Sequence, residues 1–325
     1  MRLEGRILTT LMTAGALCLG IGSAQAIVFD DQYSLTQPAA ELVMPFDATA
    51  GKSSFLLVSN PDAVSLSASQ VSTHWVFWGQ NCRELADVSI CLTLNDTIVV
   101  DPRDITSVGP DNEKLGPTVN LDGQRGLVTV VAYETDADCS PFFRTSATLK
   151  NSAIVGTFTL ADTDAGYSFG NDAFGLFLTD SGDAVRLPDG SDVDRYALQT
   201  LNPEPEEVVS LVILGHLTEA DGIVKPTSSQ ARFFASFYDS LEVNTSLPDV
   251  VVGCPVFRPI AKGTTALIPD FVTVSSAGIL SLTPEPSLSD SSYLFGIVGQ
   301  ALGTFGASSR IKVDLCDPLI SGCTI

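Results

Sequence analysis

The sequence predicts an all-β protein, an antiparallel β-sandwich of the Ig-like or jelly-roll-like kind with few or no helices. Apolar residues recur at every second position in many short segments, as in strands that bury one face. Clusters of Gly, Pro, Asn and Asp separate these segments where the chain can reverse. Surface helix formers are scarce, since Asp outnumbers Glu 27 to 11 and Lys occurs only six times. A β-barrel is the alternative architecture.

The individual segments support this prediction in chain order. Residues 87–95 alternate apolar and polar side chains, so Val88 and Ile90 share one face. Residues 231–239 instead carry aromatic side chains on both faces, which predicts a strand that is buried on both sides. The other strand candidates are residues 54–60, 73–78, 97–102, 127–134, 153–160, 171–180, 208–217, 249–257, 270–276, 294–300 and 310–315.

We expect residues 27–325 to form one large β-sandwich domain, because 45% hydrophobic residues can bury a substantial core. The Pro- and Glu-rich stretch 201–207 is the best candidate for a break between two lobes, since alternating Pro extends the chain. Both halves contain a strand, a loop, a second strand and then a cysteine. This order fits a degenerate duplication, but any disulfide-bonded β protein can produce it.

The first 26 residues have the features of a cleaved secretory signal peptide. Arg2 and Arg6 precede an uncharged, mostly apolar run at residues 7–22, and small residues at Ala24 and Ala26 form a cleavage site. A membrane anchor is the alternative, but the run is shorter than the roughly 20 apolar residues that a span needs. We expect a secreted or cell-surface protein, with the periplasm as an alternative location and no transmembrane segment.

Export indicates that the cysteines form disulfides. Six cysteines follow the predicted signal peptide, and an even number in an oxidising compartment is typical of disulfide bonds. A zinc site is the alternative, but the chain has no C-x-x-C motif and only two histidines. Short loops favour two of the pairs and elimination leaves the third: Cys82–Cys91, Cys316–Cys323 and Cys139–Cys254.

The charge balance excludes some classes of partner. The formal net charge is −21, and such a surface repels nucleic-acid phosphates and anionic lipid headgroups. We therefore expect no nucleic-acid binding. Acidity also permits cation binding, so calcium is the one cofactor that the sequence suggests.

The stretch GYSFG at residues 166–170 matches G-x-S-x-G, the nucleophile elbow of α/β-hydrolases. Ser168, Asp194 and His216 follow the chain order of that triad. An elbow needs a strand before the serine and a helix after it, whereas loop residues precede Ser168 and a strand pattern follows it. The glycines more simply serve a turn, and the three residues are weak catalytic candidates.

Two further clusters are weak binding candidates. Residues 72–79 are the most aromatic stretch, and in a strand Trp75 and Trp78 point to opposite faces, so one Trp belongs to the core while His74 and Trp78 can form a shallow site. Acidic loops offer oxygen ligands for calcium, although neither loop fits the EF-hand pattern. The calcium candidates are Asp162, Asp164, Asp189, Asp192 and Asp194.

These observations favour a non-catalytic secreted or cell-surface protein with a binding, adhesive or structural role toward a surface, glycan or protein partner. An extracellular hydrolase that uses Ser168 or a carboxylate pair is one alternative. A calcium-dependent adhesive module is another. Self-assembly through exposed strand edges is also compatible with the sequence.

Overall fold

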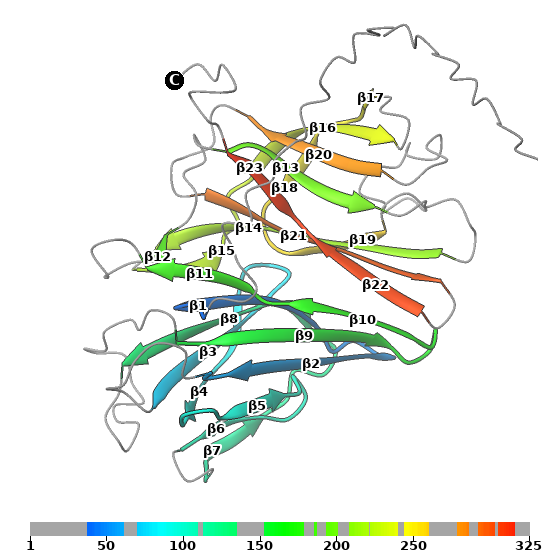
Figure 1. The fold of residues 1–325 in the computed structure, drawn as a ribbon. Helices are drawn as coiled ribbons and strands as arrows, with labels where there is room; N and C mark the ends of the chain where they lie inside the picture. The colour runs from blue at the N-terminus through cyan, green and yellow to red at the C-terminus, as the bar shows by residue number, and fades with distance from the viewer. Residues whose placement is uncertain are drawn as a thin grey trace, which may run out of the picture.

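The structure is a computed structural model, and Figure 1 shows its fold. It describes residues 38–61, 70–109, 113–134, 153–178, 185–186, 193–200, 208–220, 222–239, 244–259, 278–285, 292–302 and 305–315. These residues form strands and turns without any α-helix, so the predicted all-β class is confirmed and the sheets pack as a β-sandwich does. No helix in the described part of the chain has the length and apolar character needed to cross a membrane.

The described strands of the first half form two sheets, which we call N-outer and N-inner. The N-outer sheet has the order β10-β9-β2-β5, with β10 (Tyr167–Asp172), β9 (Val155–Asp162), β2 (Lys52–Ser59) and β5 (Thr97–Val100). The N-inner sheet has the order β12-β11-β1-β8-β3-β4-β6-β7, with β12 (Val185–Arg186), β11 (Phe174–Leu178), β1 (Glu41–Asp47), β8 (Arg125–Glu134), β3 (Val71–Gly79), β4 (Glu84–Leu92), β6 (Ile105–Val108) and β7 (Lys114–Val119).

The second half forms two more sheets, C-inner and C-outer. The C-inner sheet has the order β15-β14-β21-β22, with β19 also paired to β14; these are β15 (Ile223–Pro226), β14 (Val208–Ala220), β21 (Ser292–Leu302), β22 (Phe305–Arg310) and β19 (Val256–Pro259). The C-outer sheet has the order β17-β16-β20-β13-β23, with β18 paired to β16; these are β17 (Asn244–Ser246), β16 (Ala231–Asp239), β20 (Gly278–Pro284), β13 (Val193–Thr200), β23 (Lys312–Leu315) and β18 (Val250–Val252).

Within the described residues, no strand of the first half pairs with a strand of the second half. The described strands up to β12 pair within the first half, and those from β13 onward pair within the second half. The predicted break at residues 201–207 therefore follows β13, the first strand of the second half. The side chains nevertheless form one continuous hydrophobic core through both halves.

The two halves repeat one topology. In chain order β1, β2, β3, β4, β5, β8, β9, β10 and β11 correspond to β13, β14, β16, β18, β19, β20, β21, β22 and β23. The antiparallel pairs β1–β8, β1–β11, β3–β8, β3–β4, β2–β5, β2–β9 and β9–β10 recur as β13–β20, β13–β23, β16–β20, β16–β18, β14–β19, β14–β21 and β21–β22. The structure therefore contains a duplicated sandwich, in which β2 corresponds to β14.

Side-chain contacts give the order in which the sheets face one another, N-outer, N-inner, C-inner and C-outer, and the first half lies below the second half in Figure 1. Leu42 of β1 packs against Gly156 of β9, which joins N-outer to N-inner. At the far side of the stack, the rings of Tyr196 in β13 and Tyr293 in β21 lie 5.8 Å apart and join C-inner to C-outer. Apolar faces are thus buried between successive layers.

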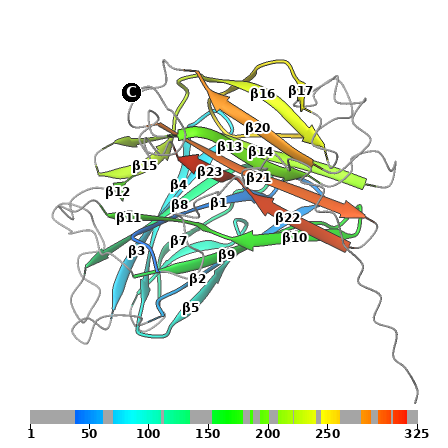
Figure 2. The ribbon, with the colours of Figure 1, turned by 45° about the horizontal axis from the view of Figure 1, so that its top comes forward.

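The contact between N-inner and C-inner holds the halves together. The rings of Phe174 in β11 and Phe295 in β21 have centroids 4.6 Å apart, and both residues are buried. The Val224 amide of β15 donates a hydrogen bond of 2.9 Å to Oε2 of the buried Glu41 in β1. A second contact joins N-outer to C-inner at their edges: β10 and β22 lie side by side in Figures 1 and 2, and Asn171 donates to Ser308 Oγ between these strands at 3.0 Å.

One sequence prediction about burial is wrong. Residues 231–239 form β16, but only one face of this strand is buried: Phe233 and Phe237 lie inside, whereas Phe234 is 48% exposed. The reason is the position of β16 in the outermost layer, where no further sheet covers its second face in the described part of the structure.

The inner interface predicts that the halves unfold together. Phe295→Ala removes most of a buried ring between N-inner and C-inner, and we expect a loss of about 3–5 kcal/mol of unfolding free energy. Urea unfolding followed by Trp fluorescence checks this, because both Trp residues lie in the first half although Phe295 lies in the second. Phe55→Ala, at an exposed Phe, should cost less than about 1 kcal/mol. A fluorescence transition that Phe295→Ala leaves unchanged would show that the halves unfold independently.

Candidate functional site

An open pocket lies where three turns of the first half meet. The turns follow β1, β3 and β7, and the pocket has a volume of about 850 Å³. Its lining residues are Thr49, Gly79, Gln80, Asn81, Arg83, Leu85, Gly123, Gln124 and Arg125. Two of these residues are arginines and three are amides, whereas no described lining residue carries a carboxylate.

Arg125, at the start of β8, is held from two sides. Its Nε donates a hydrogen bond of 2.7 Å to Oε1 of Gln80. Its guanidinium lies 5.2 Å from the ring centroid of Phe257, a buried residue of β19 in the second half. A cation over an aromatic face is stabilised by the ring quadrupole. Arg125 is therefore positioned by both halves of the chain.

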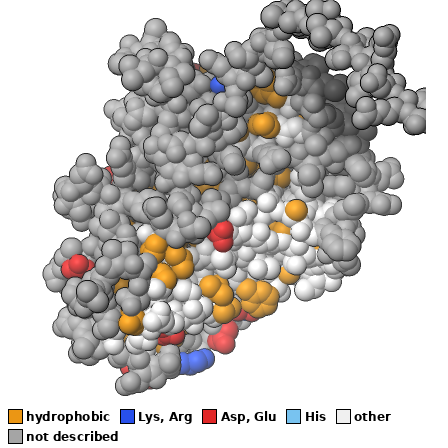
Figure 3. All heavy atoms as spheres, in the orientation of Figure 1, with side chains coloured by type: hydrophobic (Ala, Val, Ile, Leu, Met, Phe, Trp, Pro, Cys, Tyr) orange, Lys and Arg blue, Asp and Glu red, His pale blue; other side chains and the backbone are white. Residues whose placement is uncertain are grey.

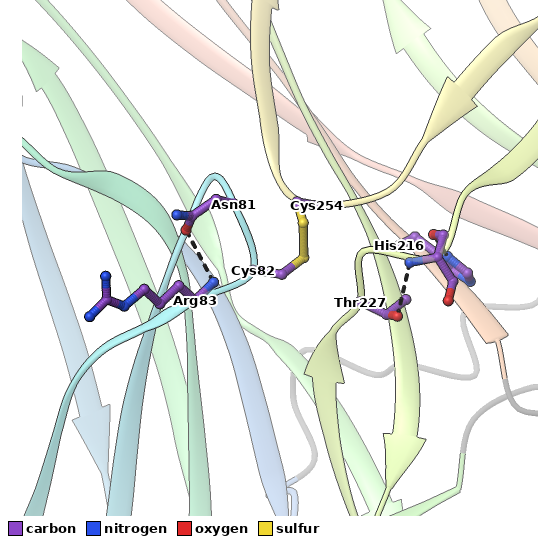
Figure 4. The surroundings of a disulfide bond; sticks show 7 residues. Asn81, Cys82, Arg83, His216, Thr227 and Cys254 are labelled. Atoms are coloured by element: carbon purple, nitrogen blue, oxygen red, sulfur yellow. Dashed lines mark hydrogen bonds between the residues drawn. A yellow bond between two sulfur atoms is a disulfide. The ribbon is translucent and has the colours of Figure 1, made fainter.

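Arg83 reaches the pocket from the tight turn between β3 and β4. The turn is closed by hydrogen bonds from the Cys82 amide to the Gly79 carbonyl and from the Gly79 amide to the Arg83 carbonyl, both 2.9 Å. Asn81 Oδ1 accepts a further bond from the Arg83 amide at 3.1 Å. The Arg83 side chain is exposed, and Figure 4 shows it extending away from the turn.

The neighbouring arginine, Arg103, has a structural role. Its Nη2 donates to the carbonyls of Ala48 and Thr49 at 3.1 Å and to that of Lys52. Its Nε donates to Asp122 Oδ1 at 3.1 Å. Arg103 thereby fixes the turn between β1 and β2, which supplies Thr49 to the pocket wall.

A disulfide beside the pocket joins the two halves. Cys82, in the turn before Arg83, is bonded to Cys254, which lies between β18 and β19 (Figure 4). The two cysteines are 172 residues apart in the sequence. Cys82 has a positive φ of 57°, a conformation that few non-glycine residues adopt, so the bridge and the turn together hold this backbone.

This bond corrects the predicted pairing. Cys82–Cys91 and Cys139–Cys254 are both wrong, because Cys82 and Cys254 are each other's partners. Cys91 is also disulfide-bonded, within the buried part of β4. The short-loop argument fails because the fold brings the tip of the β3–β4 turn against the second half. The predicted pair Cys316–Cys323 lies outside the described residues.

Ser168 does not sit on an elbow. GYSFG forms the end of the turn and the second strand of the β9–β10 hairpin, in which Ser168 pairs with Ala161 and a strand follows directly. Gly166 supplies the turn with a positive φ of 73°. The exposed Ser168 lies on the outward face of the N-outer sheet, so the motif serves a hairpin, as the glycines suggested.

The other two triad candidates are not brought to Ser168 by any described contact. His216 is buried in β14, where its Nδ1 lies 2.7 Å from the Ser229 carbonyl and its amide donates to Gly253 at 2.8 Å. Burial lowers the pKa of His216, and the bond to Ser229 opposes that shift in part. Asp194 lies in β13 of the C-outer sheet. His216 is thus a packed histidine next to the strand that leads to Cys254.

The aromatic stretch in β3 alternates as predicted. Trp75 is fully buried and donates from Nε1 to Thr73 Oγ1 at 2.9 Å, while Trp78 points to the opposite face and donates to Thr129 Oγ1 at 3.1 Å. His74 is buried, with Nε2 3.9 Å from Asp87 Oδ2. His74 is thus buried and the Trp78 indole N–H is used inside the protein, so the two side chains do not form an exposed platform.

Two of the calcium candidates, Asp162 and Asp164, share the β9–β10 turn, whereas Asp194 lies in β13 of the second half. Asp162 is bonded to Lys52, and its Oδ1 accepts the amides of Asp164 and Ala165 at 3.2 and 2.9 Å, which closes the β9–β10 turn. Asp164 is exposed beside Gly51. Asp189 and Asp192 lie outside the described residues. In the described part of the chain, no three His, Cys, Asp or Glu residues gather in a group that could hold a metal ion.

No protein-family model matches this chain, and no curated protein is similar to it in sequence. Arg83 and Arg125 are not among the site residues that the sequence predicts. The sequence feature that could have indicated Arg83 is its position directly after a cysteine in the turn-forming stretch 79–83.

The disulfide generates a direct prediction. A digest of the unreduced protein should contain the peptide of Cys82 linked to the peptide of Cys254, and mass spectrometry identifies it. The double variant Cys82→Ser/Cys254→Ser should lose about 2–5 kcal/mol of unfolding free energy, because the bridge restricts the unfolded chain. A linked Cys82–Cys91 peptide would contradict the structure.

The Asp162 turn predicts a pH dependence. Burial raises the pKa of Asp162, but the hydrogen bond from Lys52, the backbone amides and the Lys52 charge outweigh it, so the pKa lies below its ordinary value. A lowered folded pKa stabilises the native state above about pH 4, and this contribution disappears as the pH falls through the folded pKa. Asp162→Asn should cost about 1–2 kcal/mol at pH 7 and less at about pH 3, because the pH has then fallen toward the folded pKa of Asp162.

Urea unfolding at the two pH values measures this difference. Asp122→Asn is the matched control, because Asp122 bonds Arg103 while its side chain is 70% exposed, and it should cost less than about 1 kcal/mol. An equal loss for Asp162→Asn at both pH values would refute the assignment.

Proposed function

We propose that this protein is an exported, non-catalytic binding protein whose pocket holds an anionic saccharide through Arg83 and Arg125. One observation carries the proposal: two guanidinium groups line one open pocket that has no carboxylate among its described lining residues, in a chain of net charge −21. An acidic protein repels anions over most of its surface, so a locally cationic pocket selects where an anion binds.

The chemistry of the lining fits a carboxylated sugar. Guanidinium groups bind carboxylates through two parallel hydrogen bonds, with charge assistance. The amides of Gln80, Asn81 and Gln124 offer both donors and acceptors, which suit sugar hydroxyls. A volume of about 850 Å³ accommodates more than a single small anion.

The lining offers little for catalysis. Thr49 is the one hydroxyl among the described lining residues, and its Oγ1 already donates to Asp47 Oδ1 at 2.6 Å. No described lining residue is a His, Cys, Asp or Glu that could act as a general base. Binding is therefore the function that these groups support best. The signal-like residues 1–26 and the Cys82–Cys254 bridge support export.

Titration of the mature chain with carboxylated oligogalacturonides tests the proposal. Arg83→Ala should weaken binding at least tenfold, since a charge-assisted hydrogen bond contributes about 1.5–3 kcal/mol. Arg125→Lys should also weaken it, because an ammonium group keeps the charge but loses the planar pair of donors. Affinity should fall as salt rises, since the pocket is open to solvent.

Two controls make the result specific. Arg258→Ala removes an exposed arginine of β19 that does not line the pocket, and it should leave affinity unchanged. Neutral malto-oligosaccharides should bind at least tenfold more weakly than the carboxylated sugars. Equal affinity for neutral and carboxylated sugars, no binding of either, or binding that survives Arg83→Ala would overturn the proposal.

A further inference from the structure

We propose that the Cys82–Cys254 disulfide is a redox lock on the pocket, so that the pocket holds its anion tightly only after this bond has formed. In the reduced chain, the pocket keeps its residues but loses the fixed position of its wall. This inference rests on the proposed anion binding and adds its regulation. It concerns residues 79–85, the turn between β3 and β4 with its flanks, which we call the lock turn.

The lock turn supplies most of the pocket wall. Cys82 lies in the middle of it, and the bond to Cys254 links it covalently to the second half. Figure 4 shows the Arg83 side chain extending away from this bridge. Five of the nine described lining residues belong to the lock turn: Gly79, Gln80, Asn81, Arg83 and Leu85. The position of the wall is therefore tied to a residue of the other half.

Both arginines of the pocket depend on the lock turn. Arg83 follows Cys82 directly, so a rotation of the Cys82 backbone moves it. Arg125 lies on β8, but its Nε donates a hydrogen bond of 2.7 Å to Oε1 of Gln80, which belongs to the turn. A displaced turn therefore removes one of the two contacts that orient Arg125. The other contact, with the Phe257 ring at 5.2 Å, remains because Phe257 is buried in β19.

The backbone of Cys82 needs a restraint to keep its conformation. Its φ of 57° lies in the left-handed region, where the Cβ of an L-residue comes too close to the following carbonyl oxygen. Three hydrogen bonds close the turn through the amides of Gly79, Cys82 and Arg83. Asn81 and Arg83 are exposed, so water can compete for these bonds. A cysteine that is released from Cys254 can thus rotate to a negative φ, whereas the bonded cysteine is held.

Reduction of the bridge leaves the two halves joined. The Phe174–Phe295 ring contact and the hydrogen bond from Val224 to Glu41 hold N-inner against C-inner without the sulfur atoms. The hydrophobic core also continues through both halves. In the folded protein, loss of the bridge should therefore loosen the lock turn without separating the halves.

The bridge lies where a reductant can reach it. Cys82 and Cys254 are both half-buried, whereas Cys91, which is also disulfide-bonded, is 3% exposed. Thiol–disulfide exchange needs access to a sulfur atom, so we expect a small dithiol to reduce Cys82–Cys254 before it attacks Cys91. Two electrons then pass from the dithiol to the bridge. The dithiol closes into its own disulfide, and each cysteine sulfur gains a proton.

The proposed export gives the lock its direction. Cytosolic thiols keep cysteines reduced, whereas disulfides form and persist in an oxidising compartment. A precursor that still carries residues 1–26 therefore has an unlocked pocket inside the cell, and the exported chain has a locked one. The lock thereby confines tight anion binding to the protein outside the cytoplasm.

Two double variants test whether the bond acts through the Cys82 backbone. Cys82→Ser/Cys254→Ser removes the bridge and leaves a residue that disfavours a positive φ. Cys82→Gly/Cys254→Ser removes the same bridge, but glycine adopts a positive φ about as readily as a negative one. The two variants therefore lose the same covalent link and differ in how easily the turn keeps its conformation.

Titration of the mature chain with carboxylated oligogalacturonides gives the first readout. Cys82→Ser/Cys254→Ser should bind about five- to tenfold more weakly than the oxidised wild type, because only a fraction of its molecules hold the competent turn. Cys82→Gly/Cys254→Ser should bind within about twofold of the oxidised wild type. Wild-type chain that dithiothreitol has reduced at Cys82 and Cys254, with Cys91 still bonded, should bind like the first variant.

Hydrogen exchange of the Gly79 amide gives a second readout that needs no sugar. This amide donates to the Arg83 carbonyl at 2.9 Å across the turn, and both variants retain it. It should exchange about five- to tenfold faster in Cys82→Ser/Cys254→Ser than in the oxidised wild type, and within about twofold of wild type in the glycine variant. Both variants lack the bridge, so a difference between them reports on the turn and not on overall stability.

The two readouts separate the lock from the proposed function. If the oxidised wild type binds no carboxylated sugar, the proposed function fails, and exchange at Gly79 alone decides on the lock. Equal affinity of Cys82→Ser/Cys254→Ser and the oxidised wild type overturns the lock. Equal affinity of the two variants, or equal exchange at Gly79 in both, overturns it as well, because the bond would then not act through the Cys82 backbone.

Discussion

The structure depends on two sheets, N-inner and C-inner, that are apolar on both faces. β14 is buried over residues 212–217, β21 is buried over residues 292–301, and β1 is buried at every residue, including Glu41. A sheet with two apolar faces needs a layer on each face. For both sheets, one layer comes from the same half of the chain and the other layer comes from the other half. Four layers follow from this requirement, and so does the single core. The N-outer strand β10 also covers part of C-inner, because a Cβ at Gly299 of β21 would collide with the ring of Phe169.

The sequence predicted the class of fold because period-two patterns are local. The predicted strand at residues 208–217 lies within β14, and the predicted strand at residues 294–300 lies within β21. Their place in the middle of the stack was not identified, although an unbroken apolar run is typical of a strand buried on both faces. The reverse error occurred at β16, where aromatic residues on both faces suggested full burial and the strand proved to be outermost. Alternating apolar and polar residues indicate a strand. Which sheet covers that strand depends on the topology of the whole chain, which a short sequence segment does not contain.

The candidate site was less predictable for the same reason. Cys82 and Cys254 are distant in the sequence, and their bond depends on the β3–β4 turn meeting the segment before β19. Arg125 has its place because Phe257 of the other half lies under its guanidinium. Neither the Cys82–Cys254 bond nor the Arg125–Phe257 contact can be predicted from the spacing of neighbouring residues. By contrast, strand patterns on the two sides of GYSFG already argue against an elbow, and in the structure Gly166 lies in the β9–β10 turn while Tyr167–Gly170 belong to β10.

The duplication also explains why equivalent faces differ in composition. The outward face of C-inner is permanently covered, so it tolerates Ile213, Ile297 and Phe295 without exposing them to water. The equivalent face of N-outer has Thr157 and Thr159 in the strand that corresponds to the one holding Ile297 and Phe295. Thr keeps the β-branched shape that a pleated surface favours, while its hydroxyl can be solvated when nothing covers it. Figure 3 shows the N-outer face as mostly white and orange side chains. A sheet face that nothing in the described structure covers can thus keep β-branched residues without presenting a wholly apolar surface to water.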